Sequence, residues 1–161
     1  MSLKFTNPAF VGSSLVPALA LAFMPLTTLS QPVLAQTCER LDVVGGEGTE
    51  ITKTVSPPDL LFFNNNWNTD FAMNSGRSYS YFVVDFISES GTTYNIDVFL
   101  KYPDDSVDRS YSVKERTVTE GEPIAIRAEA RSSSDPYQVN LRVGGLNSGG
   151  NTYTASVSGC R

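Results

Sequence analysis

The sequence predicts an all-β fold: a single antiparallel β-sandwich, of jelly-roll or immunoglobulin-like type, with about eight strands and its two ends joined by a disulfide. Short runs of alternating apolar and polar residues recur between clusters of glycine, proline, serine and aspartate. Helical periodicity is absent after residue 38. The only two cysteines, Cys38 and Cys160, bracket all of these runs. A β-barrel is the alternative architecture that the same pattern allows.

Residues 1–35 have the features of a secretory signal. Lys4 supplies a positive start, residues 10–24 are mostly apolar, and Val33-Leu34-Ala35 forms a small-residue cleavage site before Gln36. A retained membrane anchor is the alternative, but prolines interrupt the apolar run, and spanning a bilayer needs about 20 mostly apolar residues. We therefore expect one mature domain, residues 36–161, that is secreted or periplasmic and has no membrane span.

The two cysteines are expected to pair, because exported proteins fold in an oxidising compartment. The alternative is a lipoprotein with lipid on Cys38, which would leave Cys160 unpaired. Ala35-Gln36-Thr37 does not resemble the residues that precede a lipid-attachment cysteine. The absence of an Asn-x-Ser/Thr acceptor sequence favours a bacterial origin.

The expected strands differ in how strongly their residues alternate. The clearest is 93–102, in which every second residue from Tyr94 to Tyr102 is large and apolar. Strands 124–131 and 137–143 alternate in the same way, as expected of sheets with one solvated face. Residues 79–87 are apolar on both faces apart from Asp85, which predicts a central strand covered on each side. Weaker strands are expected at 41–44, 51–55, 111–118 and 153–158.

The last strands resemble the closing hairpin of bacterial pre-peptidase C-terminal domains. The resemblance rests on Tyr137-Gln138-Val139-Asn140-Leu141-Arg142-Val143-Gly144-Gly145, a glycine-rich turn, and Thr152-Tyr153-Thr154-Ala155-Ser156-Val157-Ser158. The turn Tyr102-Pro103-Asp104-Asp105 also looks like that family. The resemblance implies a jelly-roll-like sandwich with a non-catalytic role.

The composition excludes most catalytic chemistry and several kinds of partner. The chain contains no histidine, which removes the usual general base and the commonest ligand of zinc, copper and iron. With both cysteines in one bond, no thiolate nucleophile remains. A net charge of −5 without a basic cluster argues against nucleic acid and anionic membranes as partners. We expect a non-enzymatic protein without a cofactor; a hydrolase using two carboxylates is a distant alternative.

Three aspartates within five residues, Asp104, Asp105 and Asp108, have the charge density that calcium requires. The alternative is an ordinary turn in which aspartate is favoured for its hydrogen bonds to the local backbone. The segment lacks the spacing of a helix-flanked calcium loop. We therefore predict no metal site, with calcium at these aspartates as the possibility to be tested.

The most unusual segment, residues 60–71, contains four aromatic residues and four asparagines. Asn66, Trp67, Asn68 and Asp70 are candidates for a ligand site, because a tryptophan beside amide and carboxylate groups can stack on a sugar ring and bind its hydroxyls. The alternative, favoured by the usual burial of tryptophan, is that Trp67 caps one end of the sandwich.

A second candidate surface is a charged outer sheet face. Phe99, Arg127 and Arg142 occupy outward positions of their strands, and an outward aromatic among charges is typical of an interface. The sequence thus predicts a secreted binding or structural domain, with carbohydrate or cell-surface matrix as the first expected ligand. The alternative is a protein-interaction subunit of an extracytoplasmic assembly, docking through the face that carries Phe99 and Arg127.

Overall fold

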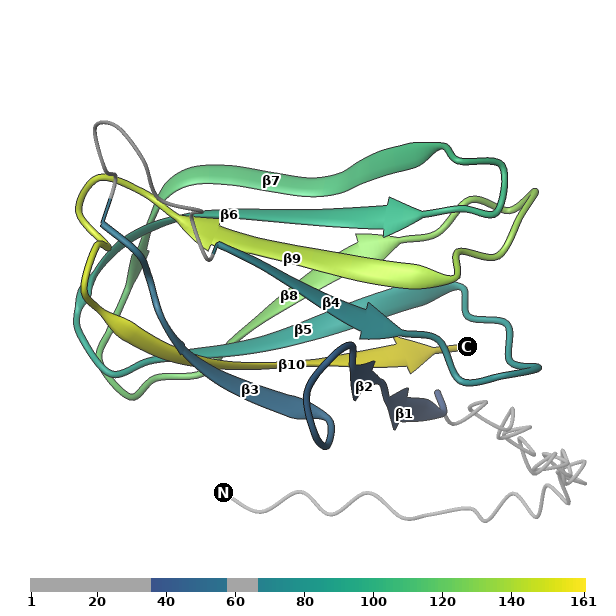
Figure 1. The fold of residues 1–161 in the computed structure, drawn as a ribbon, viewed down its shortest axis with the longest axis horizontal. Helices are drawn as coiled ribbons and strands as arrows, with labels where there is room; N and C mark the ends of the chain where they lie inside the picture. The colour runs from purple at the N-terminus through teal and green to yellow at the C-terminus, as the bar shows by residue number, and fades with distance from the viewer. Residues whose placement is uncertain (1–35, 58–66) are drawn as a thin grey trace, which may run out of the picture. The chain divides into compact units, whose positions relative to one another are not determined.

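The computed structural model describes residues 36–57 and 67–161, which form ten strands in two antiparallel sheets (Figure 1). The predicted sandwich is confirmed. The proposed secretory signal, residues 1–35, lies outside the described residues, so its cleavage stays a prediction. No helix in the described part of the chain has the length and apolar character needed to span a membrane.

Sheet A has the order β1-β10-β5-β8, and β3 also pairs with β10. Because β5 occupies one edge of β10, the short strands β1 and β3 share the other edge, β1 at the C-terminal end of β10 and β3 at its N-terminal end. The strands are β1 (Cys38–Arg40), β3 (Glu50–Thr54), β5 (Tyr81–Ser88), β8 (Ile124–Glu129) and β10 (Thr152–Cys160).

Sheet B has the order β2-β4-β9-β6-β7, so β9 and β6 form its centre and β7 is an edge strand. Its strands are β2 (Asp42–Val43), β4 (Asn68–Ala72), β6 (Thr92–Lys101), β7 (Val107–Val118) and β9 (Gln138–Gly144). The pairing of β6 with β7 contains two register shifts, one between Tyr94 and Ile96 and one between Val98 and Phe99. Such irregularities bend a strand and re-aim its side chains.

The core lies between the inner faces of the two sheets. The alternation of residues 93–102 predicts this correctly, since all five inward residues from Tyr94 to Tyr102 are fully buried. Phe86 of sheet A meets Tyr94 of sheet B edge to face at 5.2 Å between ring centroids and stacks on Tyr153 at 5.0 Å. In the expected strand 137–143, the same alternation predicts an inward side chain at Tyr137. This is wrong, because Tyr137 precedes β9 and is 50% exposed.

The Cys38–Cys160 disulfide is confirmed and joins directly paired residues of β1 and β10, with 4.1 Å between the Cα atoms. It closes a loop with a sequence separation of 122 residues. In the chain-entropy model a loop of this length destabilises the unfolded state by about 5 kcal/mol. The bond therefore adds to the backbone pairing with β10 and to the 2.6 Å hydrogen bond from Tyr79 to Glu39 in holding this three-residue strand in the sheet.

The two cysteines predict a first strand that opens at Cys38 and pairs antiparallel with the last, and this is confirmed by β1 and β10. β1 itself is too short for alternation to be visible, and β4 was not expected from the sequence. In β4 the inward positions are Thr69 and Phe71, and the polar Thr69 hides the apolar period among asparagines. β5 is an interior strand, as predicted, but the expectation that both its faces are covered is wrong at Ile87, which is 38% exposed on the outer face.

Candidate functional site

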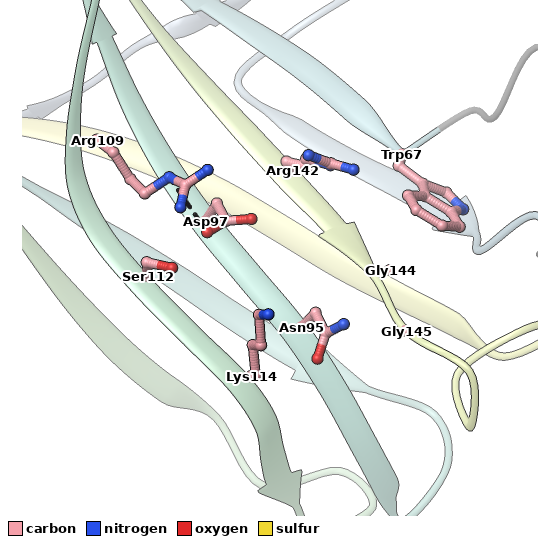
Figure 2. A pocket seen from close by; sticks show the side chains of 9 residues that line it. All are labelled: Trp67, Asn95, Asp97, Arg109, Ser112, Lys114, Arg142, Gly144 and Gly145. Atoms are coloured by element: carbon pink, nitrogen blue, oxygen red, sulfur yellow. Dashed lines mark ion pairs between the residues drawn. The ribbon is translucent and has the colours of Figure 1, made fainter.

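A pocket of about 300 Å³ opens on the outer face of sheet B, above β6, β7 and β9 (Figure 2). The residue immediately before β4 forms one of its walls. It is lined by Trp67, Asn95, Asp97, Arg109, Ser112, Lys114, Arg142, Gly144 and Gly145. Most of these side chains are polar, so the pocket suits a hydrated ligand better than an apolar one.

Trp67 is fixed in place at three points. Its carbonyl oxygen accepts a hydrogen bond from the Val143 amide at 2.9 Å, and its indole Nε1–H donates to the Ser56 carbonyl oxygen at 2.9 Å. The ring lies against Gly144, where a Cβ atom would be only 2.8 Å from Cδ2 of the indole. Trp67 packs against the core and also lines the pocket, so its ring is neither wholly core nor wholly exposed.

Arg142 lies between Trp67 and the Asp97–Arg109 pair, as Figure 2 shows. Its guanidinium carbon is 5.6 Å from the centroid of the indole. Asp97 faces Arg142 across β6 and β9 and forms an ion pair of 3.8 Å with Arg109 on β7. Asp97 is the more buried partner, with 17% of its side chain exposed against 57% for Arg109. This carboxylate therefore already has a cation beside it.

An irregularity in β7 brings Lys114 to the pocket. Glu115 has a φ of 54°, in the left-handed region, and lies at the register shift opposite Asn95. The Asn95 Oδ1 accepts a hydrogen bond from the Glu115 amide at 2.9 Å, which satisfies the backbone of the irregular residue. Lys114 and Asn95 thus reach the same end of the pocket (Figure 2).

The pocket is positively charged although the chain is acidic. Among the described residues that line it, Arg109, Lys114 and Arg142 are cationic and Asp97 is the one carboxylate, whereas the chain carries a net charge of −5. A concave site lined mainly by charges of one sign attracts ligands of the opposite sign. The pocket is therefore built to receive negative charge, or a polar group rich in hydrogen-bond acceptors.

Of the other predicted ligand residues, Asn68 and Asp70 do not line this pocket. Asn66 lies outside the described residues. Asn68 and Asp70 line a separate depression beside Lys53. Asp70 accepts hydrogen bonds from Asn140 at 2.8 Å and from Lys101 at 3.0 Å. Burial opposes its ionisation, but the bonds from Asn140 and Lys101 outweigh burial and lower its pKa. This carboxylate is engaged in linking β4 to β9, its neighbour, and to β6, the next strand beyond.

The predicted interface residues separate onto the two sheets. Arg142 and Phe99 belong to sheet B, whereas Arg127 lies on β8 of sheet A, so the expectation of one docking face carrying Phe99 and Arg127 is wrong. Arg127 stacks over the Tyr81 ring at 3.4 Å and pairs with Glu129 at 2.5 Å. Phe99 is half-buried, and the Arg109 guanidinium carbon lies 5.3 Å from its ring centroid. Only Arg142 joins the pocket.

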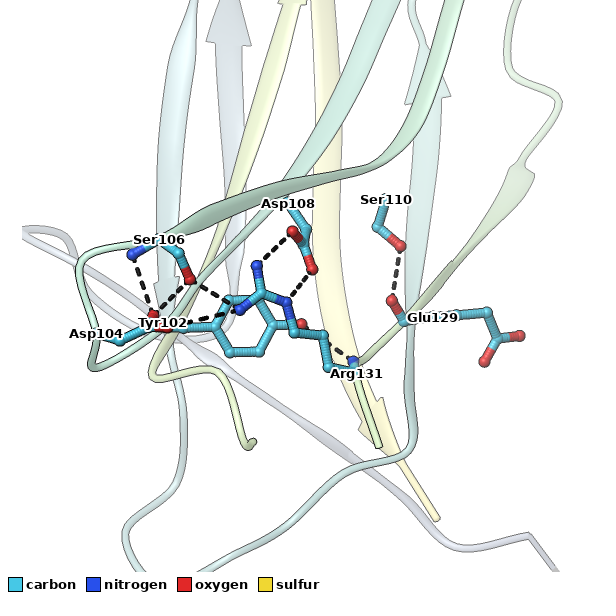
Figure 3. Close-up of polar contacts among 7 residues, drawn as sticks. All are labelled: Tyr102, Asp104, Ser106, Asp108, Ser110, Glu129 and Arg131. Atoms are coloured by element: carbon cyan, nitrogen blue, oxygen red, sulfur yellow. Dashed lines mark hydrogen bonds and ion pairs between the residues drawn. The ribbon is translucent and has the colours of Figure 1, made fainter. Parts of the chain in front are cut away.

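Two of the three aspartates of the 104–108 turn, Asp104 and Asp108, are bound by protein groups, and calcium binding there stays a possibility to be tested. Figure 3 shows Asp108 bound by two nitrogens of Arg131, each at 2.6 Å, and Asp104 bound by the hydroxyl and amide of Ser106. The Arg131 guanidinium also stacks on the Tyr102 ring at 4.1 Å. No cluster of three potential metal-binding acidic, histidine or cysteine side chains occurs within residues 36–57 and 67–161.

These contacts make the turn a structural clamp, because they tie the connection between β6 and β7 to the end of β8 in the other sheet. Hydrogen bonds from Arg131 lower the pKa of Asp108, and those from Ser106 lower the pKa of Asp104. Both carboxylates are thus held ionised by protein groups, which explains the local density of acidic residues.

Sequence reasoning missed Asn95, Arg109, Ser112 and Lys114 as pocket residues. The outward position of Asn95 on β6 could be read from the alternation. Arg109, Ser112 and Lys114 are on β7, and their position relative to β6 depends on two register shifts. Trp67 and Arg142 were both noticed, but as parts of separate sites. The structure brings them together because β4 and β9 are paired, with Asn68 opposite Arg142.

No protein-family model matches the sequence, and no curated protein is significantly similar to it. Solved structures of family 29 carbohydrate binding modules are similar in fold. One mutant of CBM29-2 has a TM-score of 0.46 and 7% sequence identity over 78% of this chain and 85% of that chain. A second CBM29-2 mutant, complexed with cellulohexaose, has a TM-score of 0.46 and 10% identity over 80% of this chain and 93% of that chain. Similarity at this level assigns neither a family nor a ligand, and the resemblance to pre-peptidase C-terminal domains stays a prediction.

Proposed function

We propose that this protein is a non-enzymatic carbohydrate-binding domain that works outside the cytoplasm, and that the sugar binds in the Trp67 pocket of sheet B. The observation that carries the proposal is an indole ring fixed at the wall of an open, polar pocket. A sugar ring has an apolar face that stacks on an aromatic side chain and a rim of hydroxyls that need hydrogen-bond partners. Asn95, Asp97 and Arg142 supply such partners next to Trp67.

The residues of the pocket favour binding over hydrolysis. Glycoside hydrolysis ordinarily requires two carboxyl groups on opposite sides of the scissile bond. Among the described residues that line this pocket, Asp97 is the single carboxylate, and it is paired with Arg109. An extracytoplasmic location is supported by the Cys38–Cys160 bond, since such bonds persist in oxidising compartments.

The test is a panel of neutral and acidic oligosaccharides titrated against the mature protein and the variants Trp67→Phe and Arg142→Gln. Trp67→Phe keeps an aromatic ring, which limits the loss of packing that Trp67→Ala would cause. Arg142→Gln is expected to bind a sugar about tenfold more weakly, because a charge-assisted hydrogen bond contributes on the order of 1.5 kcal/mol. Trp67→Phe has a smaller stacking surface and lacks the indole bond to Ser56, so it should also bind more weakly than the parent protein. Arg127→Gln on sheet A is the matched control and should bind like the parent protein. Equal losses in all three variants, or none, would refute this site.

A further inference from the structure

We propose that the sugar recognised by the Trp67 pocket is acidic: a saccharide carrying a ring carboxylate, whose charge is bound by Arg142 and Lys114. This inference rests on the proposed function and specifies its ligand class. It would give the domain a selectivity for uronate-containing polysaccharides over their neutral counterparts.

The first argument concerns which cations are already engaged. Most basic side chains in the described ranges form ion pairs, among them Arg40, Arg77, Lys101, Arg127, Arg131 and Arg161. In the pocket, Arg109 is paired with Asp97. No ion pair within residues 36–57 and 67–161 includes Lys114 or Arg142. Two unpaired positive charges therefore line one concave surface of an acidic chain.

The second argument is geometric. Arg142 comes from β9 and Lys114 from β7, on either side of β6, so they approach a ligand from two directions (Figure 2). The guanidinium carbon of Arg142 lies over the indole ring of Trp67, 5.6 Å from its centroid, in a cation–π contact. A pyranose ring stacked on the indole would thus place a substituent near the guanidinium. The planar guanidinium matches a carboxylate, with which it forms two parallel hydrogen bonds.

The third argument is the means by which Lys114 is held there. The left-handed Glu115 and the hydrogen bond between its amide and Asn95 fix the irregular part of β7 on the side of the pocket. A non-glycine residue with positive φ is uncommon and marks a constrained backbone. Here the constraint directs Lys114 toward the pocket, next to Asn95, which accepts the hydrogen bond from the Glu115 amide.

The experiment compares uronate oligosaccharides, such as those of galacturonan and alginate, with their methyl esters, which keep the rings and remove the charge. Affinities are measured by calorimetry for the mature protein, Lys114→Gln, Arg142→Gln and Arg116→Gln. Arg116 is the matched control because it is exposed on the same strand, two residues from Lys114, and does not line the pocket. Neutral cello-, manno- and xylo-oligosaccharides complete the panel.

We expect each uronate oligosaccharide to bind at least about tenfold more tightly than its methyl ester, since hydrogen bonds to charged groups are stronger than those between neutral groups. Lys114→Gln and Arg142→Gln should each lower affinity for the acid about tenfold, and Arg116→Gln by less than twofold. Binding of esters or neutral sugars with equal or greater affinity, still reduced by Trp67→Phe, would overturn this inference and leave the proposed function intact. Acid binding that Lys114→Gln weakens no more than Arg116→Gln would also overturn it. Failure of every sugar to bind would overturn both.

Discussion

Replacement of Gly144 by alanine tests whether the wall of the pocket is built as described. The new methyl group would lie 2.8 Å from Cδ2 and 3.0 Å from Cε3 of Trp67. Carbon atoms in contact are normally about 3.5 to 4.0 Å apart, so the ring would have to move by roughly 0.7 Å or more. That movement pulls on the 2.9 Å hydrogen bond from the indole to Ser56.

The expected change in stability follows from two opposing effects. Overpacking of this kind costs about 1 to 3 kcal/mol. Alanine also restricts the unfolded chain, which stabilises the fold by about 0.4 to 1 kcal/mol. The steric effect is the larger, so we expect Gly144→Ala to lower the free energy of unfolding by about 1 to 2 kcal/mol. We also expect weaker sugar binding, because the stacking surface is displaced.

Urea unfolding followed by circular dichroism measures the free energy of unfolding. The fluorescence of Trp67, the chain's single tryptophan, reports the displacement of its ring, and the emission should shift to longer wavelength as the ring becomes more exposed. Gly91→Ala is the control, since its Cβ would meet nothing closer than 3.8 Å. If Gly144→Ala matched Gly91→Ala in both stability and emission, the indole would not lie against Gly144, and the account of the pocket wall would be wrong.

Two further predictions concern buried hydroxyls and pH. The Tyr153 hydroxyl is buried and makes no hydrogen bond of ordinary length and angle in the described part of the chain, although Thr69 lies near enough to lower its pKa slightly; burial is the larger effect and raises the pKa to about 12. We therefore expect Tyr153→Phe to unfold at the same or a higher urea concentration. Tyr94→Phe, which removes a 2.7 Å hydrogen bond with Ser88, should lose about 1 kcal/mol; a larger loss for Tyr153→Phe would contradict this. The pKa values of Asp104 and Asp108, near Arg131, are lower in the folded protein than in the unfolded chain. Their contribution to the stability of the fold is therefore complete above about pH 4 and is lost as pH falls through the pKa values of the folded protein. Melting temperatures measured from pH 6 to 2 should fall less steeply in Arg131→Gln than in the parent protein, and parallel curves would show that the clamp is not involved.

The candidate site illustrates how far outward-facing residues can be placed from sequence. Arg142 was placed at an outward position by alternation, and it lines the pocket. Phe99 and Arg127 were placed outward by the same rule, but they belong to different sheets. Alternation identifies which side of its own strand a residue occupies, and it contains no information about which strands are neighbours.

The sequence by itself determined the fold class, the inward residues of the long strands and the disulfide. These depend on a period of two within one strand, or on the compartment in which paired cysteines persist. Only the tertiary structure decided where the binding surface lies. Trp67, Lys114 and Arg142 are distant in the chain and meet because β4, β9, β6 and β7 are neighbours in one sheet and because β7 is irregular opposite Asn95. Strand order and register arise from long-range packing, which no local pattern in the sequence encodes.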